Sequence, residues 1–153
     1  MILWRLSAEG YAENFDGGYG LAYDGRWNVA GWPVTYAATS PALCVLEKLV
    51  HVEDPALLPK LAMVRYEAPD ALPVDDIGMD DLPSGWTRLE THTQELGSAW
   101  LRAGKAAILR VPSAVVPLAE APDRNFVINH RHADAQHVRI RGITPFQMDL
   151  RLL

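Results

Sequence analysis

The sequence predicts a single domain of the α+β class. Its 153 residues, 49% of them hydrophobic, are enough for one core that hides roughly 70% of the surface of the unfolded chain. A few helix signals and several short strand signals follow one another in mixed order, without repeats or low-complexity tracts. Such a mixture is typical of α+β domains and not of regularly alternating α/β folds.

The first 32 residues are expected to be rich in loops. They hold six of the 11 glycines, and tyrosine and tryptophan residues lie between these glycines. Glycine lets a backbone approach a ligand closely, and aromatic rings offer flat surfaces for stacking. The segment is therefore either part of a binding site or an irregular stretch that its rings anchor to the core.

The clearest helix signal starts at Ser40. Ser40 as N-cap and Pro41 at the first helical position predict a helix that runs to about His51. On a helical wheel the expected core stripe consists of Ala42, Val45, Leu46 and Leu49, with Leu43 and Val50 at its edge. The opposite side is expected to hold Cys44, Glu47, Lys48 and His51, with Glu47 bordering the apolar face.

The remaining elements follow from periodicity and from turn residues. Strands are predicted at 34–38, 61–66, 106–111, 126–128 and 137–143, with a final extended piece at 146–152. A second helix is predicted at 91–102, stopped by Gly104, and an acidic loop at 69–83.

Charge and composition restrict the possible partners and the compartment. A net charge of -5 argues against nucleic acid as a direct partner, because phosphate binding needs a basic surface. The amino-terminal residues Met1 to Arg5 reach a charge too early for a signal peptide, and no apolar run approaches the length of a membrane span. Cys44 is the only cysteine, so we expect a buried thiol and a cytoplasmic protein.

Three local patterns resemble known functional motifs but do not meet the requirements of those motifs. The histidines and Asp134 between 130 and 137 lack the spacing of a closed zinc site, so no metal is expected. Ser113 follows a proline, and the sequence has no Gly-x-Ser-x-Gly motif of a nucleophile elbow, which argues against a serine hydrolase. Gly18-Tyr19-Gly20 has no third glycine at the required position and no predicted helix after it, which excludes a dinucleotide-binding fingerprint.

A fourth, ordered set of motifs makes the chain recognisable. The set comprises Gly25-Arg26-Trp27-Asn28, Tyr36-Ala37-Ala38-x-Ser40, Glu47-Lys48-Leu49-Val50-His51, Arg110-Val111-Pro112-Ser113, Asn125-Phe126-x-Ile128-Asn129 and Pro145-Phe146-x-x-Asp149. With Trp4-Arg5 at the start, this series resembles the RES-domain toxins over nearly the whole chain, so 1–153 is expected to be one RES domain. The chain departs from the family at His130 and Ala133, where prolines are usual.

The resemblance implies a fold and an activity. The fold would be an ADP-ribosyltransferase-like split β-sandwich with flanking helices, and the substrate would be NAD, cleaved at its nicotinamide–ribose bond without a metal. By resemblance Glu47, Tyr36 and Arg5 are the catalytic candidates. Those for binding NAD are Arg5, Arg26, Tyr36, Ser113, Trp27 and Asn28.

The resemblance leaves the acceptor of ADP-ribose open. Transfer to a cellular protein is the favoured interpretation, and passage to water or phosphate, which depletes NAD, is the alternative. Val45 stands where transferases that modify arginine often carry Glu or Gln, which argues against arginine as the acceptor. A non-catalytic binding module is the third possibility. The implied partner is an Xre-type antitoxin.

Overall fold

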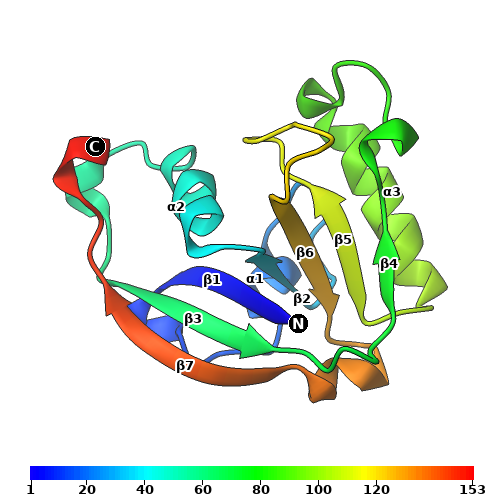
Figure 1. Cartoon of the computed structure of the whole chain (residues 1–153), viewed down its shortest axis with the longest axis horizontal. Helices are drawn as coiled ribbons and strands as arrows, with labels where there is room; N and C mark the ends of the chain where they lie inside the picture. The colour runs from blue at the N-terminus through cyan, green and yellow to red at the C-terminus, as the bar shows by residue number, and fades with distance from the viewer.

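The computed structural model describes residues 1–153 as one seven-stranded sheet with three α-helices (Figure 1). The strands are β1 (Ile2–Ala8), β2 (Val34–Ala38), β3 (Leu61–Glu67), β4 (Val74–Asp76), β5 (Ile108–Pro112), β6 (Arg124–Asn129) and β7 (Arg139–Phe146). The helices are α1 (Gly18–Ala22), α2 (Pro41–Leu49) and α3 (Glu90–Ala103). The prediction of a single α+β domain is confirmed.

The sheet consists of two halves that meet at one residue pair. Its strand order is β4-β5-β6-β2-β1-β3-β7, and every neighbouring pair is antiparallel except β4 and β5. β1 pairs with β3 along its whole length, but it joins β2 only through Trp4 and Ala38. The halves therefore open away from each other in Figure 1, as the expected split β-sandwich requires.

Alternation along the strands separates the core into two sides. Leu3, Val64 and Phe126 belong to a cluster on one face of the sheet. On the other face, α3 covers a cluster that includes Leu109 and Val127, and α2 covers one around Ala38, Leu43 and Met63. Because successive side chains of a strand point to opposite faces, each strand residue can be assigned to one side.

Most regular elements were predicted correctly. β2 and the start of α2 at Pro41 coincide with the predictions, and the Ser40 side chain accepts a hydrogen bond from the Leu43 N–H as an N-cap should. Gly104 ends α3 in a left-handed conformation with φ of 58°. Local capping chemistry fixes these boundaries, which explains why the sequence reveals them.

The first 32 residues contain more regular structure than predicted. They include β1, which lies inside the sheet, and α1, which begins at Gly18 where no helix was expected. β4 was also missed within the acidic loop, and the predicted extended piece at 146–152 is wrong, because β7 ends at Phe146 and a 3-10 turn follows. These short elements depend on pairing with distant strands.

The predicted core face of α2 is wrong. The buried residues of this helix are Leu43 and Cys44, whereas Leu46 is 41% exposed. α2 contacts β1 and β2 through one narrow side, and its apolar residues outside that side remain at the surface. Burial of Cys44 is confirmed and raises the pKa of its thiol to about 12.

No helix combines the length and the hydropathy needed to cross a lipid bilayer.

Candidate active site around Glu47

Glu47 is held by two donors that converge on one of its oxygens. Its Oε1 accepts a hydrogen bond of 2.7 Å from the Ser113 hydroxyl and one of 2.6 Å from the Asn125 side-chain amide. Glu47 lies one helical turn after the buried Leu43, on the side of α2 that faces the sheet. Glu47, which was predicted to border the apolar face of the helix, therefore points toward the polar side chains of Ser113 and Asn125.

Ser113 acts within the protein and not at its surface. It is fully buried, and its oxygen accepts hydrogen bonds from the N–H groups of Val115 and Val116 at 3.0 and 3.2 Å. Its own O–H is thus free to be donated to Glu47. The residue that the resemblance implies as a ligand of NAD contacts the carboxylate instead.

Asn125 and Tyr36 lie on the same face of the sheet. Asn125 pairs with Ala38 and Val127 pairs with Tyr36, and directly opposed residues project to the same side. Tyr36 and Ala38 are two residues apart on β2, which separates them by about 7 Å along the strand. The face that carries Asn125 and receives Glu47 therefore continues directly to Tyr36.

The hydroxyl of Tyr36 fixes the turn at residues 25–28. It donates to Asn28 Oδ1 at 2.6 Å and accepts from the Trp27 N–H at 3.0 Å. Burial raises the pKa of Tyr36, so the phenol stays protonated and serves as the donor that Asn28 needs. Asn28 in turn donates to the carbonyl groups of Tyr23 and Val29. The structure thus commits the Tyr36 hydroxyl to this turn.

Arg26 occupies the outer position of that turn. Its Nη1 donates one hydrogen bond, 3.2 Å long, to the Thr87 carbonyl, which leaves the other N–H groups of the half-buried guanidinium without a partner in the chain. Gly25 is required beside it, because an added Cβ would lie 2.6 Å from both Asn28 Oδ1 and the Tyr36 hydroxyl. The turn therefore presents a guanidinium with donors to spare.

Trp27 and Asn28 form the buried base of the turn. Trp27 is 1% exposed and packs against Trp86, with ring centroids 6.2 Å apart, and Asn28 is completely buried. The Gln94 side chain of α3 donates to the Gly25 carbonyl and fixes the turn from the other side. Trp27 and Asn28 therefore form the buried side of the turn that carries Arg26.

Arg5 lies on the opposite face of the sheet. It alternates with Trp4 on β1 and shares its face with Leu3, whereas Tyr36 projects to the other side. Its Nη2 donates to the Tyr11 carbonyl at 2.9 Å, its guanidinium stands 5.9 Å from the Tyr66 ring centroid, and its Nε is buried without a partner. The structure does not bring Arg5 to Glu47.

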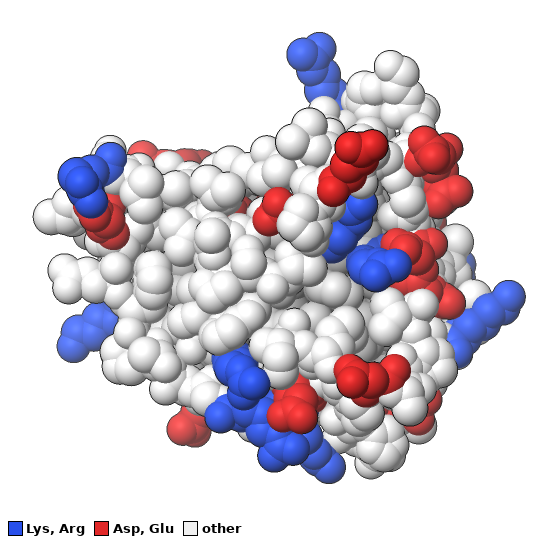
Figure 2. All heavy atoms as spheres, viewed as in Figure 1, with Lys and Arg blue, Asp and Glu red and all other residues white.

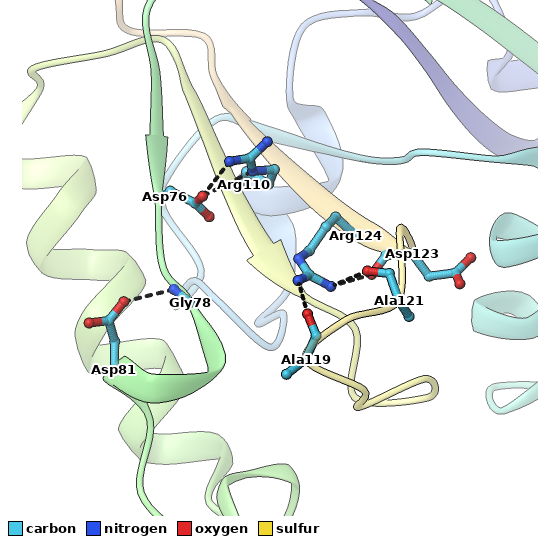
Figure 3. Close-up of polar contacts among 8 residues, drawn as sticks. All are labelled: Asp76, Gly78, Asp81, Arg110, Ala119, Ala121, Asp123 and Arg124. Atoms are coloured by element: carbon cyan, nitrogen blue, oxygen red, sulfur yellow. Dashed lines mark hydrogen bonds and ion pairs between the residues drawn. The ribbon is translucent and has the colours of Figure 1, made fainter.

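A second polar group lies on the face of β5 and β6 that is opposite to the face carrying Asn125 (Figure 3). Arg110 forms an ion pair with Asp76, and Arg124 donates to the carbonyl groups of Ala119 and Ala121, beside a pocket of about 280 Å³. Both guanidinium groups thus bind groups of the same chain. Arg124 braces the loop that begins at Ser113, and so it supports the Glu47 site indirectly.

Charged side chains of both signs stand beside one another over β4, β5 and β6, whereas the surface over α2 and β1 carries few (Figure 2). In this view basic side chains gather at the lower edge of the molecule, near β7, with an acidic side chain among them (Figure 2).

The histidine-rich segment does not assemble a metal site. His130 Nε2 lies 2.8 Å from the Thr35 hydroxyl, with Phe15 edge-on against its ring, and burial lowers the pKa of His130. His132 and His137 each approach Asp134 only to 3.9 Å. No group of three or more ligating side chains is arranged to hold a metal ion.

The structure thus sorts the predicted site residues into three sets. Glu47 and Ser113 contact each other, the turn residues from 25 to 28 assemble with Tyr36 on the same face, and Arg5 lies apart. Asn125 is the residue that the site prediction missed. The signal for it was present, because Asn125 opens one of the motifs that carry the resemblance.

Comparisons with known proteins identify relatives along the whole chain. A family described as "RES domain" matches residues 2–149. A protein named "Toxin Res" from Pseudomonas putida is 42% identical over 99% of both chains. A protein named "Prs ADP-ribosylating toxin" from a Sphingobium species is 30% identical over 98% of this chain and 95% of its own.

A solved structure shares the fold at low sequence identity. It is the crystal structure of the Mycobacterium tuberculosis MbcT–MbcA toxin–antitoxin complex, in which the matched chain is 15% identical. The TM-score is 0.77, and the match covers 95% of this chain and 84% of the other.

Proposed function

Because this chain belongs to the RES domain family, we propose that it is the toxin of a toxin–antitoxin pair that cleaves NAD and transfers ADP-ribose to a cellular protein. The observation that carries the proposal is the Glu47 carboxylate, fixed through Oε1 by Ser113 and Asn125. The name of the Sphingobium relative, an ADP-ribosylating toxin, supports the same activity.

The proposed reaction needs a negative charge beside the ribose. The bond between the ribose C1′ and the nicotinamide nitrogen breaks, and its electron pair leaves with nicotinamide. Positive charge then develops at C1′ until an acceptor atom bonds there and loses its proton. A preorganised carboxylate accepts a hydrogen bond from a ribose hydroxyl and stabilises this charge, which is the role proposed for Glu47.

Arg26 and Tyr36 would bind the rest of the substrate. The unpartnered N–H groups of Arg26 suit the pyrophosphate, which planar guanidinium groups bind through paired hydrogen bonds. The hydroxyl of Tyr36 is occupied, so its ring is the part proposed to flank nicotinamide. Trp27 and Asn28 would shape the pocket, and Ser113 would act through Glu47.

The acceptor distinguishes the proposed transferase from its alternatives. Purified protein is incubated with NAD labelled in its adenylate part, with and without cell extract, and proteins and small molecules are separated. We expect label on an extract protein with the unchanged chain and with Glu95→Gln, a substitution on the exposed side of α3, but not with Glu47→Gln.

Two other results would contradict a protein transferase. Free ADP-ribose or its phosphate as the only product that depends on Glu47 would indicate an enzyme that depletes NAD. Absence of any labelled product would indicate a non-catalytic binding module.

Arg5 and Arg26 should respond differently to substitution by methionine. We expect Arg26→Met to lower kcat/KM for NAD by about tenfold or more, because charge-assisted phosphate contacts are lost. Arg5→Met should instead reduce the free energy of unfolding by about 1–3 kcal/mol, since the carbonyl groups of Tyr11 and Ala12 lose a charged donor. Turnover of folded protein and chemical denaturation measure the two effects. A larger loss of turnover in Arg5→Met would restore Arg5 to the catalytic set.

An antitoxin is the proposed protein partner. The structural relative is a toxin–antitoxin complex, and the resemblance implies a partner of the Xre type. Such a partner would neutralise the protein by covering the Glu47 site. Co-expression that relieves growth inhibition, together with protection of NAD in the purified complex, would test this role.

A further inference from the structure

We infer that Asn125 is a positioning residue that fixes the Glu47 carboxylate so that only its second oxygen, Oε2, meets the substrate. This inference rests on the proposed function. It extends that proposal to a residue that touches neither NAD nor the acceptor and acts through Glu47 alone.

The two hydrogen bonds leave Glu47 with one free oxygen. Asn125 and Ser113 both donate to Oε1, whereas Oε2 accepts no hydrogen bond within the chain. Three buried side-chain atoms of the chain have no hydrogen-bond partner, namely Arg5 Nε, Tyr66 Oη and Ser98 Oγ, and Glu47 Oε2 is not among them. It is therefore open to solvent, and its lone pairs can accept a ribose hydroxyl.

Asn125 is held more rigidly than a loop residue would be. It lies within β6 between two strands, paired with Ala38 on one side and with Val111 on the other. Ser113 directly follows the last residue of β5, so of the two donors only Asn125 lies within a strand. A catalytic side chain supported from regular strands keeps its geometry better than one supported from loops.

Without the Asn125 donor, Glu47 would keep only the hydroxyl bond from Ser113. A single hydrogen bond allows the carboxylate to rotate, and this rotation exchanges the positions of its two oxygens. Because misplacement of a reacting group by about 1 Å costs on the order of 100-fold in rate, the effect should appear in kcat.

The test compares Asn125→Ala and Asn125→Asp with the control Asn129→Ala. Asp preserves the volume of Asn but replaces the donor by a second carboxylate facing Oε1. Asn129 lies on the same strand, is 2% exposed, and accepts from the Arg131 N–H, far along β6 from Glu47. We expect both Asn125 variants to lower kcat about ten- to 100-fold at unchanged KM for NAD, and Asn129→Ala to alter stability alone.

A double substitution separates positioning from general packing. In a Glu47→Gln background, Asn125→Ala should cause little further loss of kcat, because no carboxylate remains to be positioned. An equal loss in both backgrounds, or an Asn125→Asp variant with unchanged kcat, would overturn the inference.

A spectroscopic readout keeps the inference testable if the chain does not cleave NAD. The side-chain amide signal of Asn125 in a 15N-labelled protein should move when Glu47 is replaced by Ala, because its hydrogen-bond acceptor is lost. An unmoved signal would overturn the inference. Absence of NAD cleavage together with a moved signal would overturn only the proposed function.

Discussion

Replacement of Glu47 by Gln should reduce nicotinamide release from NAD by on the order of 100-fold or more, which is the typical cost of removing a preorganised charge-stabilising group. The variant should fold, because the glutamine carbonyl can accept the hydrogen bonds from Ser113 and Asn125 at the position of Oε1. The amide nitrogen then takes the place of Oε2. The developing positive charge would meet a neutral donor in place of an anion.

Nicotinamide release under saturating NAD measures this effect directly. Glu95→Gln, on the exposed side of α3, makes the same chemical change away from the site and should keep normal turnover. Chemical denaturation of both variants separates loss of catalysis from loss of folding. A folded Glu47→Gln protein that releases nicotinamide at the normal rate would refute the role of Glu47.

Replacement of Gly97 by Ala should strongly destabilise the chain. A Cβ at Gly97 would lie 1.8 Å from the Trp27 carbonyl oxygen and 2.7 Å from its carbon. Neither backbone atom can yield as the end of a flexible side chain does, so α3 and the turn must separate. We expect a loss of about 3 kcal/mol or more, beyond the gain in helix propensity that alanine normally brings.

Thermal or chemical unfolding of Gly97→Ala measures the loss. The matched control is Gly142→Ala on β7, where an added Cβ has no atom within 4 Å and should leave stability nearly unchanged. Equal stability of the two variants would contradict the close approach of α3 to Trp27. Since Arg26 precedes Trp27, the folded fraction of Gly97→Ala should also bind NAD more weakly.

The sequence predicted elements that local chemistry defines. Ser40 and Pro41 start α2, and Gly104 ends α3, because capping and left-handed backbone conformations depend on residues within one turn. β1 was missed because its residues become a strand only by pairing with β3, almost 60 residues away. The helical wheel predicted the wrong buried face of α2, because it assumes that apolar residues mark the packed side and Leu46 is apolar but exposed.

The candidate site was predicted in part for a similar reason. Glu47, Tyr36 and Arg26 were proposed from motifs, and the structure assembles Tyr36 with the Arg26 turn and gives Glu47 its two donors. Motifs did not reveal that Ser113 points inward to Glu47, or that Arg5 lies on the opposite face. Those facts follow from strand alternation and from register, which a list of residue types does not contain.

The place of β6 in the chain determines when a newly made molecule can complete the support of Glu47. β6 lies between β5 and β2, and it carries Asn125, whereas the carboxylate it supports belongs to a helix that is synthesised about 80 residues earlier. At roughly 5–20 residues per second, the ribosome needs several seconds to cover that interval. An unfinished chain that ends before residue 124 therefore lacks both the strand and the donor, so the support of Glu47 is completed only late in translation.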